Sequence, residues 1–330
     1  MPTGDHVKAL LASHAEGDDA QFFAVAMQIA AAEARVGHGK FAEELRSMID
    51  KAKVRRAPNP HAPIPLARPR GELADILSAS YPKVTRADMV LDLALGLRLE
   101  RVIKEHKAVR MIRSRGLAPR RKLLLVGKPG TGKTMTASAL AGELGLPLFV
   151  VRLDGLITKF MGETSAKIRL VFDAMAQTRG VYLFDEFDSI GSERGLGNDV
   201  GEIRRVVNAF LQMVEQDNSD SLIIAATNHA GLLDRALFRR FDDIISFELP
   251  DAPQIKLLIQ NKLTGFKRGK LKWPAIAKAA LGLSYADIAR ASDDAIKDSL
   301  IGERETIEQA DLMTAIRERH LTFAGSERST

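Results

Sequence analysis

The 330-residue sequence contains no cysteine, a single tryptophan and no apolar stretch long enough to cross a bilayer. Without cysteine, disulfide frameworks, thiolate metal sites and cysteine nucleophiles are excluded. Residues 1–12 also lack the basic-then-apolar layout of a secretory signal. We therefore expect a cytoplasmic chain with no membrane span. Because 45% of the residues are hydrophobic, the chain can bury a core, and its length predicts two or three domains.

Positive charge is unevenly distributed along the chain. The net charge is +6, but ten Lys and Arg residues against two Glu residues give the segment Arg98–Lys122 a local charge of +8. Such a segment could bind nucleic acid. It could equally be the solvated face of a helix, and we prefer this interpretation because a run of charge is weak evidence for a binding site.

The N-terminal region has the periodicity of short helices. Two apolar stripes at helical spacing lie within residues 1–55; their members are Phe22, Val25, Ala26 and Ile29, then Phe41, Leu45, Met48 and Ile49. Five prolines follow between Pro58 and Pro69. Proline at this density fixes φ and removes hydrogen-bond donors. The sequence thus predicts a helical module over 1–55 and a proline-rich linker over 56–72.

From residue 73 onward, short apolar runs alternate with helical segments, after a long helical stretch over 88–115. The runs predict five strands, namely Lys122–Val126, Leu148–Val151, Val181–Phe184, Leu222–Ala226 and Ile244–Phe247. Alternation of this kind favours an α/β domain over 73–249, with a parallel sheet and helices on both faces. After Pro250 we expect no strands, only a small all-α domain over 250–325. Its last helix is predicted to open with a capping box of Thr306 and Gln309.

Gly127–Thr134 (GKPGTGKT) fits the pattern Gly-x4-Gly-Lys-[Ser/Thr] of a phosphate-binding P-loop. It follows a predicted strand and opens a predicted helix, which argues against a chance glycine turn. Gly130 and Gly132 let the backbone wrap round phosphate oxygens. Lys133 can reach the β- and γ-phosphates of ATP, and Thr134 can ligate Mg²⁺. The expected nucleotide contacts are Gly127, Lys128, Pro129, Gly130, Thr131, Gly132, Lys133, Thr134, Met135 and Asp185.

Polar side chains follow two of the predicted strands. Asp185 ends an apolar strand and can hold the Mg²⁺ shell, while the adjacent Glu186 can orient and polarise the attacking water. A merely polar strand end is the alternative, and the P-loop upstream argues against it. Asn228 follows another strand, where it could contact the γ-phosphate or nucleate a turn. Spacing alone leaves those two interpretations of Asn228 open.

Taken together, residues 85–320 resemble the AAA family of the AAA+ superfamily, with katanin and spastin among the similar members. GKPGTGKT resembles the family's GPPGTGKT, with Lys128 where proline is usual. YLFDEFDSI resembles its Walker B segment, which places Asp185 and Glu186. Ala226-Thr-Asn228 matches the end of its sensor strand, which makes Asn228 sensor 1.

The resemblance also implies sites that the residues alone do not indicate. Residues 233–242 resemble the arginine-finger segment, so Arg239 and Arg240 would reach the ATP of a neighbouring subunit; without the family they would be exposed basic residues. This implies a homo-hexamer. Lys159, Phe160 and Met161, before Gly162-Glu163, resemble the first pore loop, whose aromatic grips a polypeptide. By composition alone Phe160 would be a core residue. Residues 191–201 would form a second pore loop.

Three features depart from the family pattern. The pore aromatic is Phe160, where Tyr or Trp is commoner. Tyr285 stands where the sensor 2 segment (282–288) usually has glycine, which puts the base and ribose contacts in doubt. The Gly-Gly signature usually found upstream of the P-loop is absent, and the basic helical stretch 88–115 takes its place.

From the residues and the resemblance we expect an Mg²⁺-ATP-dependent, ring-forming ATPase that remodels, unfolds or translocates protein substrates through a central pore. Residues 1–72 carry no motif, and we expect them to select a substrate or adaptor. A protease or another effector enzyme is a further expected partner. A nucleic-acid-dependent ATPase is the alternative, motivated by the basic segment, and a non-catalytic nucleotide-controlled scaffold is a third hypothesis.

Overall fold

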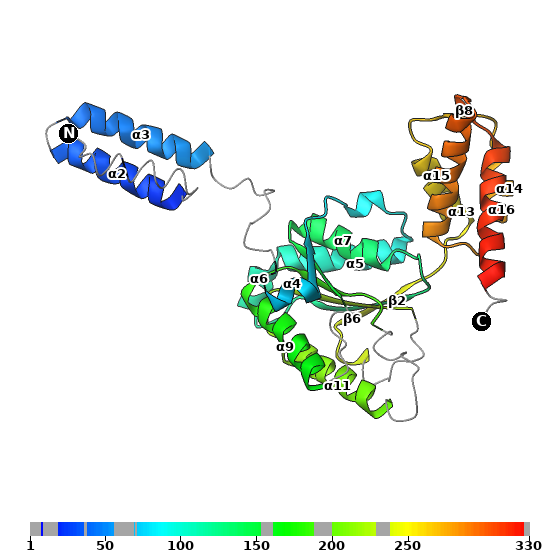
Figure 1. Cartoon of the computed structure of the whole chain (residues 1–330), viewed down its shortest axis with the longest axis horizontal. Helices are drawn as coiled ribbons and strands as arrows, with labels where there is room; N and C mark the ends of the chain where they lie inside the picture. The colour runs from blue at the N-terminus through cyan, green and yellow to red at the C-terminus, as the bar shows by residue number, and fades with distance from the viewer. Residues whose placement is uncertain are drawn as a thin grey trace. The chain divides into compact units, whose positions relative to one another are not determined.

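The computed structural model describes residues 8, 19–35, 38–55, 69, 71–152, 161–187, 200–228 and 238–326 (Figure 1). The chain divides into two compact units, Met1–Ala62 and Pro63–Thr330. Most of the predicted linker lies outside the described ranges, so its boundaries stay a prediction. Within those ranges, no helix combines the length and the apolar character needed to cross a membrane.

The first unit contains two packed helices, α2 (Asp19–Arg35) and α3 (Gly39–Arg55). Val25 and Ala30 of α2 and Ala42 and Ile49 of α3 are buried. The apolar stripe predicted for α3 is therefore only partly right, because Phe41 and Met48 are 51% and 67% exposed. The inner face follows residues 42, 45 and 49, which share one side of a helix with 3.6 residues per turn.

A six-stranded sheet forms the centre of the second unit, in the order β1-β3-β4-β5-β2-β6. All strands run parallel except β1, which pairs antiparallel with β3. The strands are β1 (Leu77–Ser80), β2 (Lys122–Gly127), β3 (Leu148–Val151), β4 (Val181–Phe184), β5 (Leu222–Thr227) and β6 (Asp243–Phe247). This confirms the predicted α/β class and adds β1, which was missed because a four-residue strand with two serines gives little apolar signal.

Helices cover both faces of this sheet (Figure 1). On one face lie α5 (Leu93–Lys107) and α7 (Lys133–Leu144), and on the other α9 (Met161–Gln177) and α11 (Val200–Gln216). In β2, Leu123 and Leu125 pack towards α5 and α7, whereas Leu124 packs towards α9 and α11. A strand buried on both faces needs apolar residues at successive positions, which explains the unbroken apolar runs in the sequence.

The predicted helical stretch over 88–115 is shorter and interrupted in the structure. A 3-10 turn, η2 (Arg86–Asp88), precedes α5, and α6 (Val109–Ser114) follows it. Asp92 caps α5 by accepting a hydrogen bond from the Leu95 N–H at 2.7 Å. A short helix, α4 (Glu72–Ile76), leads into β1. The segment Met89–Asp92 therefore crosses from η2 to α5 as extended chain, which matters for the site below.

The last part of the chain is a helical bundle with its own core. Its helices are α13 (Ala252–Lys262), α14 (Trp273–Ala280), α15 (Tyr285–Ile301) and α16 (Gln309–Ser326). Ile259, Ile276, Ile288 and Leu312 are fully buried in this core, one from each helix. We call this bundle the lid.

Two predictions for the lid are wrong. A short parallel pair, β7 (Lys267–Arg268) and β8 (Thr306–Ile307), occurs where no strand was expected. Thr306 consequently lies in β8 and does not cap α16. The Glu308 N–H instead donates to Asp311 Oδ2 at 2.8 Å, and the Gln309 side chain accepts from the Lys272 N–H at 2.9 Å. The Ser/Thr-x-x-Gln pattern does not form a capping box here, because the Gln309 side chain bonds to the backbone of Lys272 in the loop before α14.

Most of the basic side chains in the segment 98–122 are paired, some with acidic residues of the same segment and some with residues distant in sequence. Six of its ten basic side chains form ion pairs, with Glu100, Glu105, Asp217, Asp220 and Asp243 as partners. The Lys122 amine donates to the Glu215 carbonyl oxygen at 3.2 Å. Among the described residues, only Lys107, Arg110 and Arg115 of this segment lack such a partner. These pairs join α5 to β6 through Arg98, and they join α6 and Arg121 to the loop before β5, as expected for a structural role.

A buried histidine on α5 makes the fold sensitive to acid. His106 is 4% exposed, and its Nε2–H donates to the Arg120 carbonyl oxygen at 2.8 Å in the neutral tautomer. Burial lowers the pKa of His106 below its ordinary value of 6.5, and the charges of Arg179 and Arg121 act in the same direction. The unfolded chain thus binds this proton more readily than the folded chain does.

We expect this histidine to contribute to acid destabilisation. As the pH falls below 6.5 towards the lowered pKa, the unfolded state gains a proton first, so the free energy of unfolding decreases. His106→Gln should lose less of that free energy between pH 7.5 and pH 5.5, measured by urea unfolding. His320→Gln, at an exposed histidine of α16, is the matched control and should behave as the parent does. An unchanged pH slope in His106→Gln would contradict the assignment.

Candidate nucleotide-binding site

The predicted P-loop connects β2 to α7 at the carboxyl edge of the sheet. Gly130 and Gly132 have φ of +73° and +103°, which side-chain-bearing residues rarely adopt. A Cβ on Gly130 would lie 2.4 Å from the Ser284 Oγ of the lid. The Ala286 N–H donates to the Gly130 carbonyl oxygen at 3.1 Å. Glycine is thus required here both by backbone conformation and by the close approach of α15.

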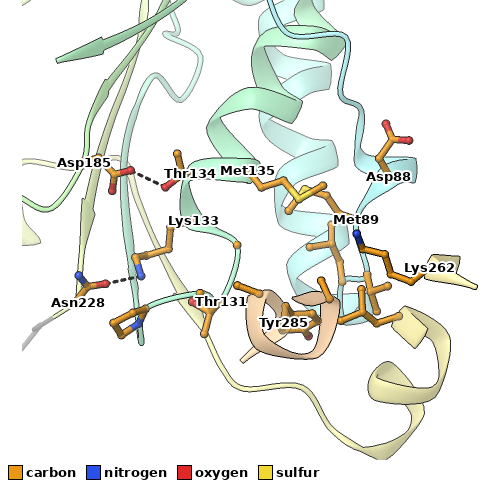
Figure 2. Close-up of a pocket in the computed structure, with 18 of the residues that line it drawn as sticks. Asp88, Met89, Thr131, Lys133, Thr134, Met135, Asp185, Asn228, Lys262 and Tyr285 are labelled. Atoms are coloured by element: carbon orange, nitrogen blue, oxygen red, sulfur yellow. Dashed lines mark hydrogen bonds between the residues drawn. The ribbon is translucent and has the colours of Figure 1, made fainter. Parts of the chain in front are cut away.

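Lys133 joins the P-loop to the neighbouring strand end. It is 6% exposed, and its Nζ donates to the carbonyl oxygens of Gly127 at 2.7 Å and Lys128 at 2.9 Å. The third bond goes to Asn228 Oδ1 at 2.8 Å (Figure 2). An ammonium has three N–H donors, so this one group can join the loop backbone to the asparagine. The structure therefore brings Lys133 and Asn228 together at the ends of β2 and β5.

Thr134 and Asp185 form a second contact at the same edge. The Thr134 hydroxyl donates to Asp185 Oδ2 at 2.6 Å (Figure 2). A hydroxyl beside a carboxylate is a set of hard oxygen donors, and Mg²⁺ is bound through one or two carboxylates together with substrate phosphates. The residues present therefore fit the divalent ion that the P-loop pattern implies.

Glu186 is held in an unusual backbone conformation. Its φ is +51°, its side chain is exposed, and its N–H donates to Asp185 Oδ1 at 3.0 Å. The next residue, Phe187, is 1% exposed, and its N–H donates to the Ala226 carbonyl oxygen at 2.9 Å. The Phe187 ring packs 4.6 Å from that of Phe210 in α11. A left-handed turn thus presents the Glu186 carboxylate to the site while its neighbour is anchored in the core.

These groups line a cavity of about 500 Å³, formed by the P-loop, the strand ends, the segment 88–91 and the lid. Lys133, Thr134, Asp185 and Asn228 lie at one end of it, and Asp88, Met89, Lys262 and Tyr285 lie at the other (Figure 2). Pro129, Thr131 and Met135 also line it. The Thr131 hydroxyl donates to the Lys128 carbonyl oxygen at 2.8 Å, which closes the turn of the loop.

Sequence reasoning did not find the lining residues contributed by the segment 88–91 and by α13. Met89, Val90, Leu91, Leu258 and Lys262 are far from the P-loop in sequence and belong to no motif. Periodicity could indicate only that Leu258 faces inward on its helix, not which element it meets. Leu258 and Lys262 reach the cavity because the lid docks there, and Met89, Val90 and Leu91 reach it on the extended chain between η2 and α5.

The structure distinguishes the two predicted arginine fingers. Arg240 Nη1 forms an ion pair with Glu215 Oε2 of α11 at 2.6 Å, within the same chain. Arg239 is exposed, and the described residues give it no ion pair. Lys159 and Phe160 lie outside the described residues, as does most of the predicted second pore loop. Met161 begins α9, but its side chain is not described.

Comparison with known proteins agrees with this geometry. The model of the ATPase family associated with various cellular activities (AAA) matches residues 123–249. An AAA family ATPase designated y4kL, from Sinorhizobium fredii, is 37% identical over 330 residues, which cover 99% of this chain and 98% of that protein. The AAA domain of FIGL-1, a crystal structure, has a TM-score of 0.59 and 23% identity, over 77% of this chain and 92% of its own; this supports the fold.

A larger relative is similar over the ATPase part alone. The ATP-dependent zinc metalloprotease FtsH 1 of Methylacidiphilum infernorum is 34% identical over 242 residues, which are 70% of this chain but 37% of the metalloprotease. This chain therefore spans little more than a third of that protein. Because the relative from S. fredii is similar from end to end, and because a P-loop, two strand-end carboxylates and an asparagine meet in one cavity, the chain belongs to the AAA family of ATPases.

Proposed function

We propose that this ATPase assembles into a ring, hydrolyses Mg²⁺-bound ATP between neighbouring subunits, and uses the energy to remodel protein substrates drawn through the ring. The observation that carries the ATPase half is the convergence of Lys133, Thr134, Asp185 and Asn228 in one cavity. The remodelling half rests on the segment Lys159–Glu163, which resembles a pore loop, and on the likeness to an ATP-dependent metalloprotease.

In this proposal each residue has one task. The P-loop N–H groups and the Lys133 ammonium bind the phosphates. Thr134 and Asp185 would hold Mg²⁺, which neutralises charge on the phosphate oxygens. Glu186 orients the attacking water and takes its proton, while Asn228 positions that water beside the γ-phosphate. Arg239 of a neighbouring copy stabilises the negative charge that develops in the transition state.

We assign no proteolytic step to this chain. Among the described residues, no group of three His, Cys, Asp or Glu side chains could hold a metal ion, and the sequence has no cysteine. A peptidase or another effector enzyme is a partner that we propose for this ring. We propose that residues 1–72 select the substrate or an adaptor, because the helices α2 and α3 form a compact unit of their own.

Protein and nucleic acid can be compared directly as activators. We expect a loosely folded protein, α-casein, to increase ATP turnover, and Phe160→Ala to remove that stimulation while basal turnover remains. Phe266→Ala, at a 39%-exposed phenylalanine of the lid, is the matched control and should keep the stimulation. ATP turnover is also measured at low salt with single- and double-stranded DNA and RNA in place of casein. Stimulation by nucleic acid with none by casein would overturn the proposal.

A further inference from the structure

An aromatic residue, Tyr285, lines the end of the cavity formed by the lid and the segment 88–91. It has no role in the phosphate binding or hydrolysis proposed above. Tyr285 is the first residue of α15, and it lines the cavity with Met89, Val90 and Leu91 of the core and Leu258 of α13. Within the described residues its hydroxyl makes no hydrogen bond. Figure 2 shows Tyr285 and Met89 on the side away from Asp185 and Asn228. Tyr285 therefore lies away from the side chains that we expect to contact the γ-phosphate and Mg²⁺.

The charges at that end do not favour a second phosphate position. The Lys262 Nζ lies 3.0 Å from both carboxylate oxygens of Asp293, so its charge is balanced within the lid. Asp88, also on the lining, accepts hydrogen bonds from the N–H and the hydroxyl of Thr85. An anion gains little there, whereas an apolar ring fits against Met89 and Leu258. With the phosphates at the P-loop, the apolar lining beside Tyr285 is left for the base.

The Tyr285 hydroxyl is neutral at physiological pH. Burial raises the pKa of Tyr285 to about 12, and the carboxylates of Asp251 and Asp92 act in the same direction. Asp251 caps α13 of the lid, and Asp92 caps α5 of the core. The Tyr285 side chain lines the cavity beside the segment 88–91 and Leu258.

We propose that Tyr285 is the residue that binds the nucleobase, with its ring packed against the base and opposite Met89 and Leu258. This rests on the nucleotide site of the proposed function and adds the element that recognises the base. A glycine at this position would offer the base only backbone. The side chain adds an aromatic face whose stacking on a base is worth about tenfold or more in affinity. A base bound beside Tyr285 would thereby contact both the lid and the core.

The test separates base from phosphate by using two ligands. ADP contains the base, whereas inorganic tripolyphosphate can occupy only the P-loop. We expect Tyr285→Ala to lower ADP affinity about tenfold, measured by calorimetry, and to leave tripolyphosphate affinity within about twofold. Tyr285→Phe should stay within about twofold of the parent for both ligands. Ile301→Ala, at an 81%-exposed residue of the same helix, is the matched control and should change neither.

Other outcomes would overturn the proposal. Unchanged ADP affinity in Tyr285→Ala would show that the ring does not contact the base. An equal loss for both ligands would show that the residue acts through the adjacent Ala286–Gly130 hydrogen bond on the P-loop. Fluorescence of Trp273, the single tryptophan, which packs on the lid core, reports whether the lid stays folded. No protein substrate is used, so failure of the remodelling proposal would leave these affinities unchanged.

Discussion

Glu186→Gln should lower the ATP turnover of this protein about 10²- to 10⁴-fold and leave ATP affinity within a few-fold of the parent. Glutamine keeps the length of the side chain and its hydrogen-bonding shape, but it cannot accept the proton of the attacking water. The phosphate-binding contacts of Lys133 and the loop are untouched. Turnover is measured by phosphate release, and affinity by calorimetry or by a fluorescent ATP analogue.

The control for this substitution is available in the lid. Glu303 is the other described non-glycine residue with positive φ, at +53°, and it is also exposed. Glu303→Gln reproduces the change of charge and the strained backbone away from the cavity, and should keep full turnover. Substantial hydrolysis in Glu186→Gln would remove this residue from the chemistry. If the parent itself hydrolysed no faster than the variant, the chain would be a nucleotide-controlled scaffold.

Arg239→Ala should lower turnover about 10³-fold or more, because an arginine supplied to a neighbour's site is worth about 10³–10⁵ in rate in other NTPases. Arg240→Ala should lower turnover less, since the Arg240 guanidinium is already paired with Glu215 in its own chain. Both variants should bind ATP as tightly as the parent does. The pair of substitutions therefore tests whether the exposed arginine or the paired one crosses the interface.

Mixing two inactive variants gives the decisive result. A ring containing both Arg239→Ala and Glu186→Gln copies has interfaces where an intact Glu186 meets an intact Arg239. Turnover should reappear on mixing, although each variant alone is inactive. If mixing restores nothing, or if Arg239→Ala retains parental turnover, the shared active site is contradicted. A turnover per subunit that does not rise with protein concentration would also contradict it.

Much of the fold could be predicted because its signals are local and repeated. β3 and β4 begin and end where the apolar runs do, since strands buried on both faces are apolar at each position. The meeting of Lys133 with Asn228 follows from parallel topology, because the carboxyl ends of β2 and β5 share an edge. Chain order and strand direction were enough to bring these residues together.

The rest depended on contacts between distant elements. Nothing in the composition of residues 77–80 distinguishes β1 from a loop, because its pairing with β3 decides it. Thr306 has the pattern of a helix cap, but the backbone of Lys267 and Arg268 draws its segment into a strand. The Arg240–Glu215 ion pair and the place of Met89 in the cavity lining likewise depend on how distant elements pack together. These are the positions where tertiary packing overrides local preference.

The left-handed turn at Glu186 links the reaction to the position of a helix. Phe187 is fixed against Phe210, so a shift of α11 moves the Phe187 ring and, through one peptide bond, the carboxylate before it. Because packed cores resist continuous deformation, such a shift would switch the carboxylate between discrete positions rather than let it drift. A movement of α11 against the sheet would therefore change the position of the Glu186 carboxylate relative to Thr134 and Asp185, and so couple ATP hydrolysis to a helix outside the cavity.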